Sequence, residues 1–471
     1  MTPPRTKIVC TIGPATSSRK VLKELILAGM DVARLNFSHG THEAHGKVAN
    51  SIRSLSRSLN RPVAIMLDLQ GPKIRTGLIK DGSVLVKAND PLTITTRLVK
   101  GEPGLISTTY RGITKDLQPG DKILMDDGLI ELKVQSKSKT DLFCEVVSGG
   151  IIREHKGINL PGITTGINAV TEKDKKDLDF GLTMGVDFIA ASFVRSAKDV
   201  EILKRILKKK KVNIPVISKI EKPQALDKLA EIIDASEGIM VARGDLGVEL
   251  SPEQVPVAQK KMIALANQKR KMVITATQML ESMTDHPLPT RAEASDVANA
   301  IIDGTDAIML SGETSVGKYP IKAVKMMARI ARVTEKNFPA SPPFSRKTAD
   351  FSDTISEVAC MAAENLGLKA IAAFSQSGFT ARLISKYRPW VPIIAFTTTE
   401  TVQRSLALNW GVKAYVLPVM ENSDIMIKAM EEQLRKKRLV RKNDRIVVVA
   451  GHPLQKQGKT NMMKLHVVGE N

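Results

Sequence analysis

Acidic and basic side chains follow the short apolar runs of this 471-residue chain at regular places. Glu221 and Asp245 end two consecutive runs, and two carboxylates placed in this way can share one Mg²⁺, which takes one or two carboxylates plus substrate oxygens and water. Lys219, Arg34 and Arg75 supply positive charge at similar positions. Phosphoryl transfer needs this combination, because its transition state spreads negative charge over several oxygens. These residues therefore predict a magnesium-dependent phosphoryl-transfer site.

Other polar residues also end these apolar runs. The chain has eight such runs, and six of them end with charged or hydroxyl side chains. They are Asn36, Ser38, Asp68, Arg243, Thr275, Thr277, Ser311 and Glu313. A structural network of salt bridges is the alternative interpretation. We favour a catalytic site, because the charges separate into a carboxylate pair and a group of cations.

The segment 244–259, GDLGVELSPEQVPVAQ, predicts an anion site. Gly244 allows a close approach of the backbone, and we expect the next helix to begin near Pro252. Free backbone N–H groups at a turn from loop to helix bind carboxylate or phosphate.

Two motifs suggest other chemistry and are less convincing. SGETSVGKY (311–319) has the G-x-x-x-x-G-K spacing of a phosphate-binding loop, but Tyr319 stands where that loop needs Ser or Thr. His39, His42 and His45 are spaced by three residues, yet Gly40 and Thr41 resemble a helix start that separates them. Nucleotide contact or plain surface is a better interpretation than a zinc site.

The runs that carry these residues have the length and composition of strands buried on both faces. They occupy residues 7–13, 31–38, 63–70, 186–194, 215–221, 238–245, 272–279 and 306–313. Helical patterns separate most of them, and eight such units close into a barrel more naturally than into an open sheet. The carboxyl ends of barrel strands meet at one face, where active sites lie.

The other segments predict two more domains. Residues 72–168 read as short strands with turn signals, which indicates a small β-rich lid inserted after the third barrel strand. A Pro- and Ser-rich linker (337–347) precedes apolar runs at 369–375, 391–397, 412–418 and 445–451, typical of an open α/β sheet. We therefore expect an α/β protein: a (β/α)₈ TIM barrel (1–71 and 169–338), a lid (72–168) and a C-terminal α/β domain (339–471).

Composition excludes several classes of protein. No stretch approaches the roughly 20 apolar residues of a membrane helix, and no signal peptide is recognisable. Three scattered cysteines argue against disulfides and fit a reducing compartment, so we expect a cytoplasmic protein. The net charge of +21 suggests nucleic acid as a partner. Aromatic residues make up only 4% of the chain, however, so few side chains are available to stack on bases, which argues against nucleic-acid binding. We expect the basic runs 204–211 and 434–442 to be solvated faces.

At these residues the chain resembles the pyruvate kinase family along its whole length. The matching segments are TKIVCTIGP (6–14), ARLNFSHG (33–40), GPKIRTG (71–77), ISKIEKPQAL (217–226), MVARGDLGVEL (240–250), ITATQMLESM (274–283), MLSGETSVGKYP (309–320) and TNMMKLHVV (460–468). The resemblance implies that phosphoenolpyruvate gives its phosphoryl group to ADP, making ATP and pyruvate. It also implies Mg²⁺, with Mn²⁺ as a substitute, and a homotetramer.

The resemblance also implies roles for individual residues. Lys219 stabilises the moving phosphoryl group, Glu221 and Asp245 hold Mg²⁺, and Thr277 lies where the enolate carbon is protonated. Arg34 and Arg75 contact phosphates, and the backbone at Gly244 and Asp245 meets the substrate carboxylate. Lys156 and His39 face the nucleotide with Arg75. Ser311 and Glu313 belong to a proton-relay network.

One departure from the family concerns potassium. Many members have Glu where this chain has Lys73, and that Glu goes with a bound K⁺. The tethered ammonium of Lys73 leads us to expect a vestigial or weak K⁺ site at Asn36, Ser38, Asp68 and Leu69, and activity without K⁺.

The C-terminal part resembles the effector domain of regulated family members. Ser375, Ser377 and Thr380 surround Gly378 ahead of a helix, which suits a phosphate, and Lys456 and Lys459 add charge. We expect a sugar-phosphate effector there, although an ordinary α/β connection is an equal alternative. Rival functions are a magnesium-dependent enolpyruvate aldolase or lyase on a barrel, and a basic nucleic-acid-binding protein.

Overall fold

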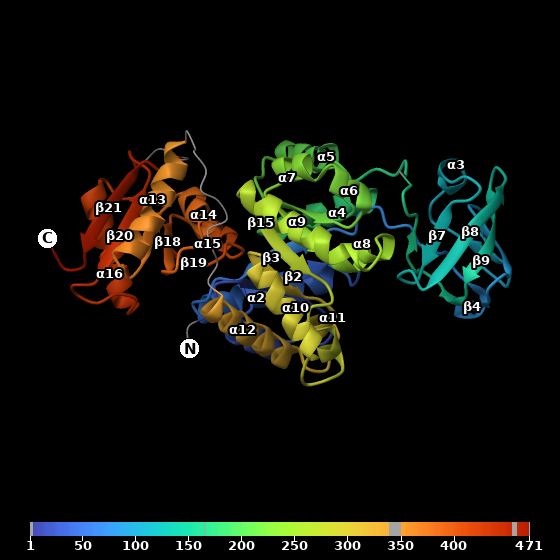
Figure 1. The fold of residues 1–471 in the computed structure, drawn as a ribbon, viewed down its shortest axis with the longest axis horizontal. Coiled ribbons are helices and arrows are strands. Elements are labelled where there is room, and N and C mark those ends of the chain that lie inside the picture. Colours follow the sequence, from blue (N-terminus) through green and yellow to red (C-terminus); the bar gives the residue numbers. More distant parts are fainter. Residues whose placement is uncertain (1–2, 164, 339–349, 455–458, 471) are drawn as a thin grey trace.

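Eight parallel strands form a closed barrel at the centre of the molecule (Figure 1). The computed structural model describes residues 3–163, 165–338, 350–454 and 459–470. Around the barrel the strands lie in the order β1, β16, β15, β14, β13, β12, β3, β2. Their bounds are β1 (Lys7–Ile12), β2 (Val32–Asn36), β3 (Ala64–Asp68), β12 (Phe188–Ala191), β13 (Val216–Ile220), β14 (Gly238–Ala242), β15 (Met272–Ala276) and β16 (Ala307–Leu310). All eight expected runs are strands, and the predicted fold class is confirmed.

The barrel closes because its strands are apolar on both faces. Inward-facing side chains such as Met66, Phe188 and Ile274 form one cluster inside it. Outward-facing side chains such as Ile65 and Ile189 pack against the surrounding helices in a second cluster.

Helices surround the barrel, and several begin at a hydroxyl cap. Thr171 and Thr290 each form a capping box with the acidic side chain three residues later. The helices are α1 (Arg19–Ala28), α2 (His42–Ser58), α4 (Glu172–Thr183), α5 (Ala197–Lys209), α6 (Pro223–Asp227), α7 (Leu229–Ala235), α8 (Arg243–Glu249), α9 (Gln254–Gln268), α10 (Arg291–Ile302), α11 (Gly312–Ser315) and α12 (Pro320–Asn337). The 3₁₀ turn η2 spans Glu281–Thr284.

The structure differs from the sequence prediction at two strand ends. The run 238–245 stops being a strand at Ala242, and helix α8 follows at once. The run 306–313 likewise gives way to helix α11 at Gly312. Helix α9 begins at Gln254, close to the expected start near Pro252.

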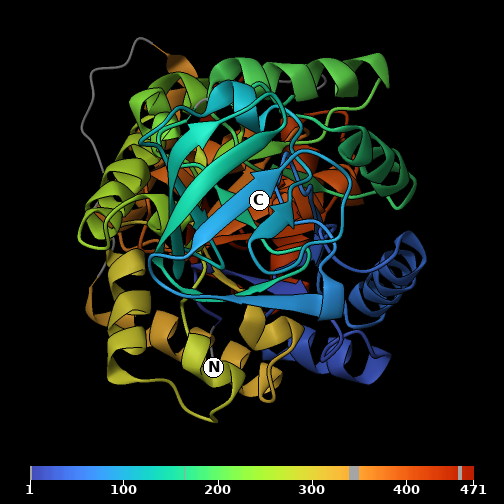
Figure 2. The same cartoon turned by 90° about the vertical axis from the view of Figure 1, so that its right-hand side faces the viewer.

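The inserted segment folds as two small sheets over the carboxyl ends of the barrel strands (Figure 2). One sheet orders its strands β11, β7, β8, β9, β5, β6, and the other pairs β10 with β4. The elements are η1 (Lys80–Gly82), β4 (Ser83–Val86), β5 (Pro91–Thr95), β6 (Leu105–Ser107), α3 (Ile113–Asp116), β7 (Lys122–Met125), β8 (Ile130–Lys137), β9 (Asp141–Ser148), β10 (Gly150–Arg153) and β11 (Ile158–Asn159). We refer to this segment as the lid.

The C-terminal domain has an open five-stranded sheet in the order β19, β18, β17, β20, β21, in which only β21 runs antiparallel to its neighbour. Its elements are α13 (Phe351–Asn365), β17 (Ile371–Phe374), α14 (Phe379–Lys386), β18 (Ile393–Thr397), α15 (Glu400–Ser405), β19 (Val412–Val416), α16 (Ser423–Lys436), β20 (Arg445–Ala450) and β21 (Met462–Val467). Strand β21 was not predicted. Most of the expected linker, from residue 339 onward, lies outside the described residues.

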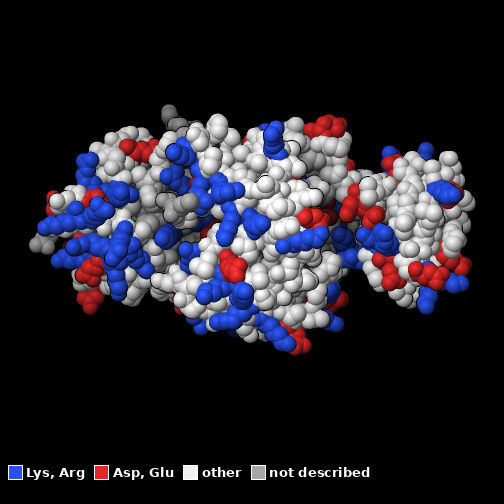
Figure 3. Space-filling view, turned by 90° about the horizontal axis from the view of Figure 1, so that it is seen from below, with Lys and Arg blue, Asp and Glu red and all other residues white. Residues whose placement is uncertain are grey.

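Positive charge collects on the C-terminal domain, at the end of the molecule away from the lid (Figures 1 and 3). The end of α16 and the loop after it carry the exposed residues Arg435, Lys436, Arg438, Arg441 and Lys442. The basic run 434–442 is therefore largely solvated, as predicted. In the part of the chain that the structure describes, no helix is both long and apolar enough to cross a membrane.

Candidate active site

Four neighbouring strands of the barrel bring Arg34, Asp68, Ser192 and Lys219 together. The Asp68 carboxylate accepts a hydrogen bond from Arg34 Nε at 2.5 Å and lies 3.3 Å from Lys219 Nζ. Lys219 Nζ also donates to Ser192 Oγ at 2.8 Å and lies 2.8 Å from Glu221 Oε1. The ammonium of Lys219 is therefore fixed by three oxygen-bearing side chains at the mouth of the barrel.

Burial and charge set the protonation of this cluster. Burial favours the neutral form of Asp68, but Lys219 and Arg34 outweigh it and hold the pKa of Asp68 below its usual range. Burial would lower the pKa of Lys219, yet the carboxylates of Asp68 and Glu221 raise it above its ordinary value. Lys219 is thus a permanent cation at neutral pH.

The carboxyl group of Glu221 behaves differently. Burial, reinforced by the nearby charge of Asp245, raises the pKa of Glu221 to about 7 against the opposing effect of Lys219. Its second oxygen, Oε2, accepts the Phe193 N–H at 2.6 Å. Two carboxyl groups that repel each other in this way form a site whose repulsion a divalent cation would relieve.

The donor set fits a hard divalent cation shared with substrate. Asp245 lies in the first turn of α8, one strand along from Glu221. Among residues 3–163, 165–338, 350–454 and 459–470, no group of three or more His, Cys, Asp or Glu side chains could hold a metal. A cation here would complete its shell with substrate oxygens and water, as Mg²⁺ does.

Thr277 follows strand β15 in a left-handed backbone conformation, with φ of 65°. Its hydroxyl accepts the Gly244 N–H at 2.7 Å and donates to the Ala276 carbonyl at 2.6 Å. The amide of Gly244 is therefore already used, which differs from the free N–H that we expected at this turn. Thr275, in contrast, is fully buried and bonds Thr305 Oγ1 at 3.0 Å, away from these residues.

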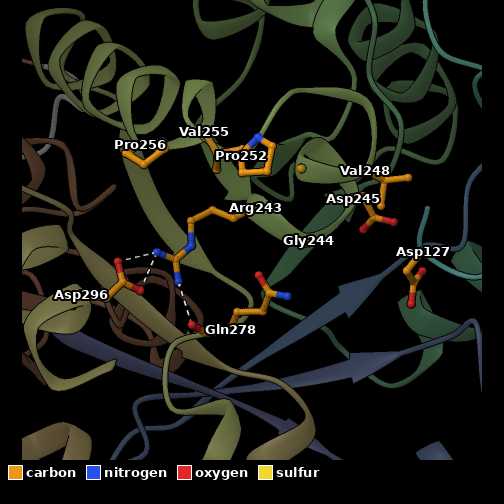
Figure 4. Close-up of a pocket in the computed structure, with 11 residues that line it drawn as sticks. Asp127, Arg243, Gly244, Asp245, Val248, Pro252, Val255, Pro256, Gln278 and Asp296 are labelled. Atoms are coloured by element: carbon orange, nitrogen blue, oxygen red, sulfur yellow. Dashed lines mark hydrogen bonds and ion pairs between the residues drawn. The ribbon is translucent and has the colours of Figure 1, made fainter. Parts of the chain in front are cut away.

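A cavity of about 580 Å³ opens beside these residues, between the barrel and the lid (Figure 4). Asp127 of the lid, Arg243, Gly244 and Asp245 line it. Within this lining, the Arg243 side chain extends to Asp296 of α10, and its Nη1 donates to both carboxylate oxygens of Asp296. Of the Glu221–Asp245 pair, Asp245 lines this cavity.

Further cations gather where the lid leaves the barrel. Arg75 Nη1 donates to the His155 carbonyl at 3.1 Å, and Lys156 Nζ pairs with Asp126 Oδ1 at 2.8 Å. Burial, followed by the charges of Arg75 and Lys73, lowers the pKa of His39. His39 is therefore mainly neutral at physiological pH, with the cations Arg75 and Lys73 close enough to act on it.

The expected monovalent-cation residues are partly engaged with one another. Asn36 Oδ1 accepts the Ser38 N–H at 3.1 Å, and the Leu69 carbonyl accepts Ser192 Oγ at 2.7 Å. Asp68 is shared between Arg34 and Lys219, as described above. Lys73 lies against the lid at Gly157 and forms no ion pair with any described residue.

Helix α11, which follows the eighth strand, carries a buried acid. Both oxygens of Glu313 accept backbone N–H groups, from Ser311 at 2.7 Å and from Leu280 at 3.0 Å. Burial raises the pKa of Glu313. The buried hydroxyl of Ser311 finds no hydrogen-bond partner within the described ranges.

The predicted phosphate-binding residues of the C-terminal domain lie together at the start of α14. Ser375 Oγ accepts the Thr380 N–H at 3.2 Å, and Thr380 Oγ1 bonds Thr460 Oγ1 at 2.8 Å. Ser377 supplies a carbonyl to Arg382 at 2.8 Å. Lys459 is exposed, and Lys456 lies outside the described residues. The hydroxyls of Ser375 and Thr380 thus have protein partners.

Sequence reasoning missed two residues that complete the ring of polar strand ends. Thr11 on β1 accepts Arg34 Nη1 at 2.9 Å, and Ser192 directly follows β12. They belong to the two strands for which no polar end was identified. The same rule would have found them, since small hydroxyl side chains also mark a strand end in a barrel.

Comparison with known proteins agrees along the whole chain. Family models described as "Pyruvate kinase, barrel domain" and "Pyruvate kinase, alpha/beta domain" match residues 3–324 and 353–466. A pyruvate kinase of Mycobacterium tuberculosis (strain CDC 1551 / Oshkosh) is 44% identical over 467 residues, which cover 99% of each chain. One of Geobacillus stearothermophilus is 46% identical over 473 residues, covering 99% of this chain and 81% of that protein. The crystal structure of a pyruvate kinase from Cryptosporidium parvum has a TM-score of 0.92 and 39% identity, covering 99% of this chain and 96% of that one.

Proposed function

This chain belongs to the pyruvate kinase family, and we propose that it moves the phosphoryl group of phosphoenolpyruvate to ADP, giving ATP and pyruvate. The observation that carries the proposal is the position of Lys219, a buried cation beside the Glu221–Asp245 pair. Such a fixed charge stabilises the transition state because it needs no reorganisation during the reaction.

Each step of the proposed reaction is assigned to particular residues of this chain. The bond from phosphorus to the enol oxygen breaks while a bond to the terminal oxygen of ADP forms, and Lys219 lies where charge moves between them. Arg34 and Arg75 hold phosphate oxygens. The enolate then takes one proton at its methylene carbon, from the side of Thr277 through water, and becomes pyruvate.

The backbone at Gly244 and Asp245 is assigned to the carboxylate of phosphoenolpyruvate. Because the Gly244 N–H donates to Thr277 Oγ1, this contact requires the amide to share or leave that hydrogen bond. Substrate binding would then act directly on the Thr277 hydroxyl, which links the two halves of the reaction.

Glu221 and Asp245 would hold Mg²⁺, or Mn²⁺ in its place. The cation supplies Lewis-acid stabilisation of charge on the phosphoryl oxygens. Members of the family generally use a divalent metal, and the raised pKa of Glu221 beside Asp245 supports this pair as the ligands.

Monovalent-cation independence is the finer part of the proposal. We infer that Lys73 substitutes for K⁺ and leaves a vestigial or weak site at Asn36, Ser38, Asp68 and Leu69. The engagement of Asp68 with Arg34 and Lys219 supports a weak site, because its oxygens already have cationic partners.

The nucleotide, proton-relay and effector sites complete the proposal. Lys156 and His39 face ADP together with Arg75, and Ser311 and Glu313 form the relay. A sugar phosphate would bind at Ser375, Ser377, Thr380, Lys456 and Lys459. We also infer a homotetramer in the cytoplasm, with the barrel, lid and C-terminal domains divided as the sequence predicts.

The test is the initial rate of pyruvate formation from phosphoenolpyruvate and ADP with Mg²⁺, measured in Na⁺ and in K⁺ buffers. We expect turnover in both. Turnover only in K⁺ would keep the kinase and reject the role of Lys73. A folded protein that makes no pyruvate in either buffer would favour an enolpyruvate lyase instead.

A further inference from the structure

Two consecutive residues after strand β15 adopt left-handed backbone conformations. Thr277 has φ of 65° and Gln278 has φ of 52°. Neither is glycine, and this conformation costs an L-residue roughly 1–2 kcal/mol. Such strain persists only where surrounding contacts hold the backbone in place.

The side chain of Arg243 provides those contacts. Its Nη2 donates to the Thr277 carbonyl at 2.6 Å and to the Gln278 carbonyl at 3.2 Å, and its Nε lies 3.2 Å from the Thr277 carbonyl. The guanidinium thus bonds the backbone of both left-handed residues, and Figure 4 shows it beside Gln278.

Asp296 of α10 fixes the guanidinium from the other side. Its two carboxylate oxygens accept Arg243 Nη1 at 2.7 and 2.6 Å. Both bonds come from the same nitrogen, so Asp296 anchors one end of the guanidinium, and the bonds of Nη2 and Nε to the backbone carbonyls set its orientation. The position of Thr277 is therefore tied to α10 through two side chains.

The contacts of Arg243 distinguish this role from two others. Each of its nitrogens already donates to the protein, including Nη1 to Gln259 Oε1 at 3.4 Å, so the guanidinium is not left for a phosphate. Arg53 shows what a purely structural arginine looks like in this chain. It pairs with Asp187 and donates to backbone carbonyls near the amino ends of the strands, far from the active-site end. Arg243, unlike Arg53, makes its bonds at the backbone of a strained active-site residue.

We propose that Arg243, anchored by Asp296, is a positioning residue that holds Thr277 in its left-handed conformation and so directs the Thr277 hydroxyl toward the enolate carbon. The inference rests on the proposed function, because it takes Thr277 as the side from which the proton arrives. In this role Arg243 acts through Thr277 and takes no part in the proton transfer itself. It acts on the geometry of one hydroxyl group, and a displacement of about 1 Å there costs on the order of 100-fold in rate.

The experiment isolates the protonation step. By microscopic reversibility, an enzyme that protonates the enolate also exchanges the methyl protons of pyruvate, which NMR follows in D₂O with Mg²⁺ and ATP present. We expect Arg243→Ala to lower both this exchange and kcat by about 100-fold, with the KM for phosphoenolpyruvate within about threefold of the parent. In a Thr277→Ala background, the same substitution should lower the remaining rate by less than about threefold, because residues that act as a unit are not additive.

Two further variants keep the test decisive. Asp296→Asn keeps the shape and weakens the anchor, so it should lower exchange by about tenfold even if Arg243→Ala does not fold. Arg53→Ala is the matched control, and it should lower the melting temperature without changing exchange per folded molecule. Losses from Arg243→Ala and Thr277→Ala that simply multiply, or an equal loss of exchange in Arg53→Ala, would overturn the inference. A parent protein that forms no pyruvate would instead overturn the proposed function.

Discussion

At the scale of single residues, the site combines Lys219, which stays protonated at neutral pH, with Glu221, which can take up a proton near neutral pH. Lys219 lies between Asp68 and Glu221, whose side chains are each 1% exposed. Glu221 has a pKa near neutrality because burial and Asp245 oppose its ionisation. With Glu221 ionised, the two cations Lys219 and Arg34 face the three carboxylates of Asp68, Glu221 and Asp245, so the cluster carries an excess of negative charge that a bound cation would offset.

Lys219→Met should lower kcat by at least about 10²–10³-fold, since it removes one fixed charge from the transition state. The fold should survive, because Arg34 still pairs with Asp68 and Glu221 can take up a proton. Steady-state kinetics and circular dichroism check both parts. Lys204→Met is the matched control. Lys204 lies on the outer helix α5 and pairs with Glu237, so its loss should leave activity unchanged. An unfolded or fully active Lys219→Met protein would contradict the assignment.

Metal stabilisation should depend on pH through Glu221. Its pKa in the folded protein, about 7, lies above the unfolded value of about 4.3, so the folded state binds more protons between those values. Without metal, this contribution to stability is present below about pH 4.3 and is lost as the pH rises to about 7. Mg²⁺ binds the carboxylate, so its stabilising effect should grow over the same interval.

Thermal unfolding with and without Mg²⁺ measures this effect. The increase in melting temperature should be larger at about pH 8 than at about pH 5.5. Glu221→Gln should make the increase small at both values. An increase that does not change with pH in the parent protein would show that Glu221 is not a metal ligand.

At the scale of elements, one carboxylate joins the lid to the barrel. Glu249, at the end of α8, accepts Asn159 Nδ2 of strand β11 at 3.4 Å and pairs with Lys222 of the barrel. Arg195 of the barrel adds a second link, since its Nη1 donates to the Thr165 carbonyl at 2.9 Å and its Nη2 to the Ile167 carbonyl at 3.2 Å. Polar contacts of single side chains therefore join the lid to the barrel beside the cavity.

Asn159→Ala should loosen the lid without unfolding it. One hydrogen bond contributes about 1 kcal/mol, so the equilibrium constant for lid closure should fall about fivefold, and the KM for ADP should rise by at most a similar factor. The free energy of unfolding of the barrel should change little. Gln135→Ala is the matched control, because Gln135 Nε2 donates to Glu145 on the exposed face of the lid at 2.6 Å. Equal kinetics in both variants would show that the Asn159 contact does not hold the lid.

At the scale of the whole molecule, the C-terminal domain covers the end of the barrel opposite the lid. Leu408 of that domain joins the cluster of side chains inside the barrel. Beside it, buried Asp306 pairs with Lys386 and lies 2.9 Å from Arg388 Nη2. A buried carboxylate with two cations fixes how the two domains sit against each other.

Asp306→Asn should destabilise the protein by about 3–5 kcal/mol, because it leaves Lys386 and Arg388 buried without their counter-charge. Chemical denaturation measures this loss, and we expect the C-terminal domain to separate from the barrel at a lower denaturant concentration. Lys47→Met removes an ion pair with Glu43 whose two side chains are 76% and 77% exposed, and it should change stability by less than about 1 kcal/mol. Similar losses in both variants would mean that the buried cluster does not join the domains.

The strand pattern was predictable because it depends on local chemistry. Each barrel strand is apolar on both faces, so the eight runs could be read from composition and spacing alone. Helix α8 was missed since it follows β14 without a side-chain cap and its sequence continues the polar end of the run. Strand β21 was missed for a related reason, because its side chains are only partly buried or exposed and show no clear apolar run.

The sequence by itself determined which charges and hydroxyls end the strands, and hence the kind of chemistry, because residue type and order are fixed along the chain. Only the tertiary structure decided which of them meet. Three hydrogen bonds show this, and each joins residues at least 33 positions apart in the chain. They link Lys219 to Asp68, Arg243 to the Thr277 carbonyl, and the Gly244 amide to the Thr277 hydroxyl. Burial decided the rest, since the pKa of Glu221 depends on the loss of water around it and on the distance to Asp245, and neither is written in the order of residues.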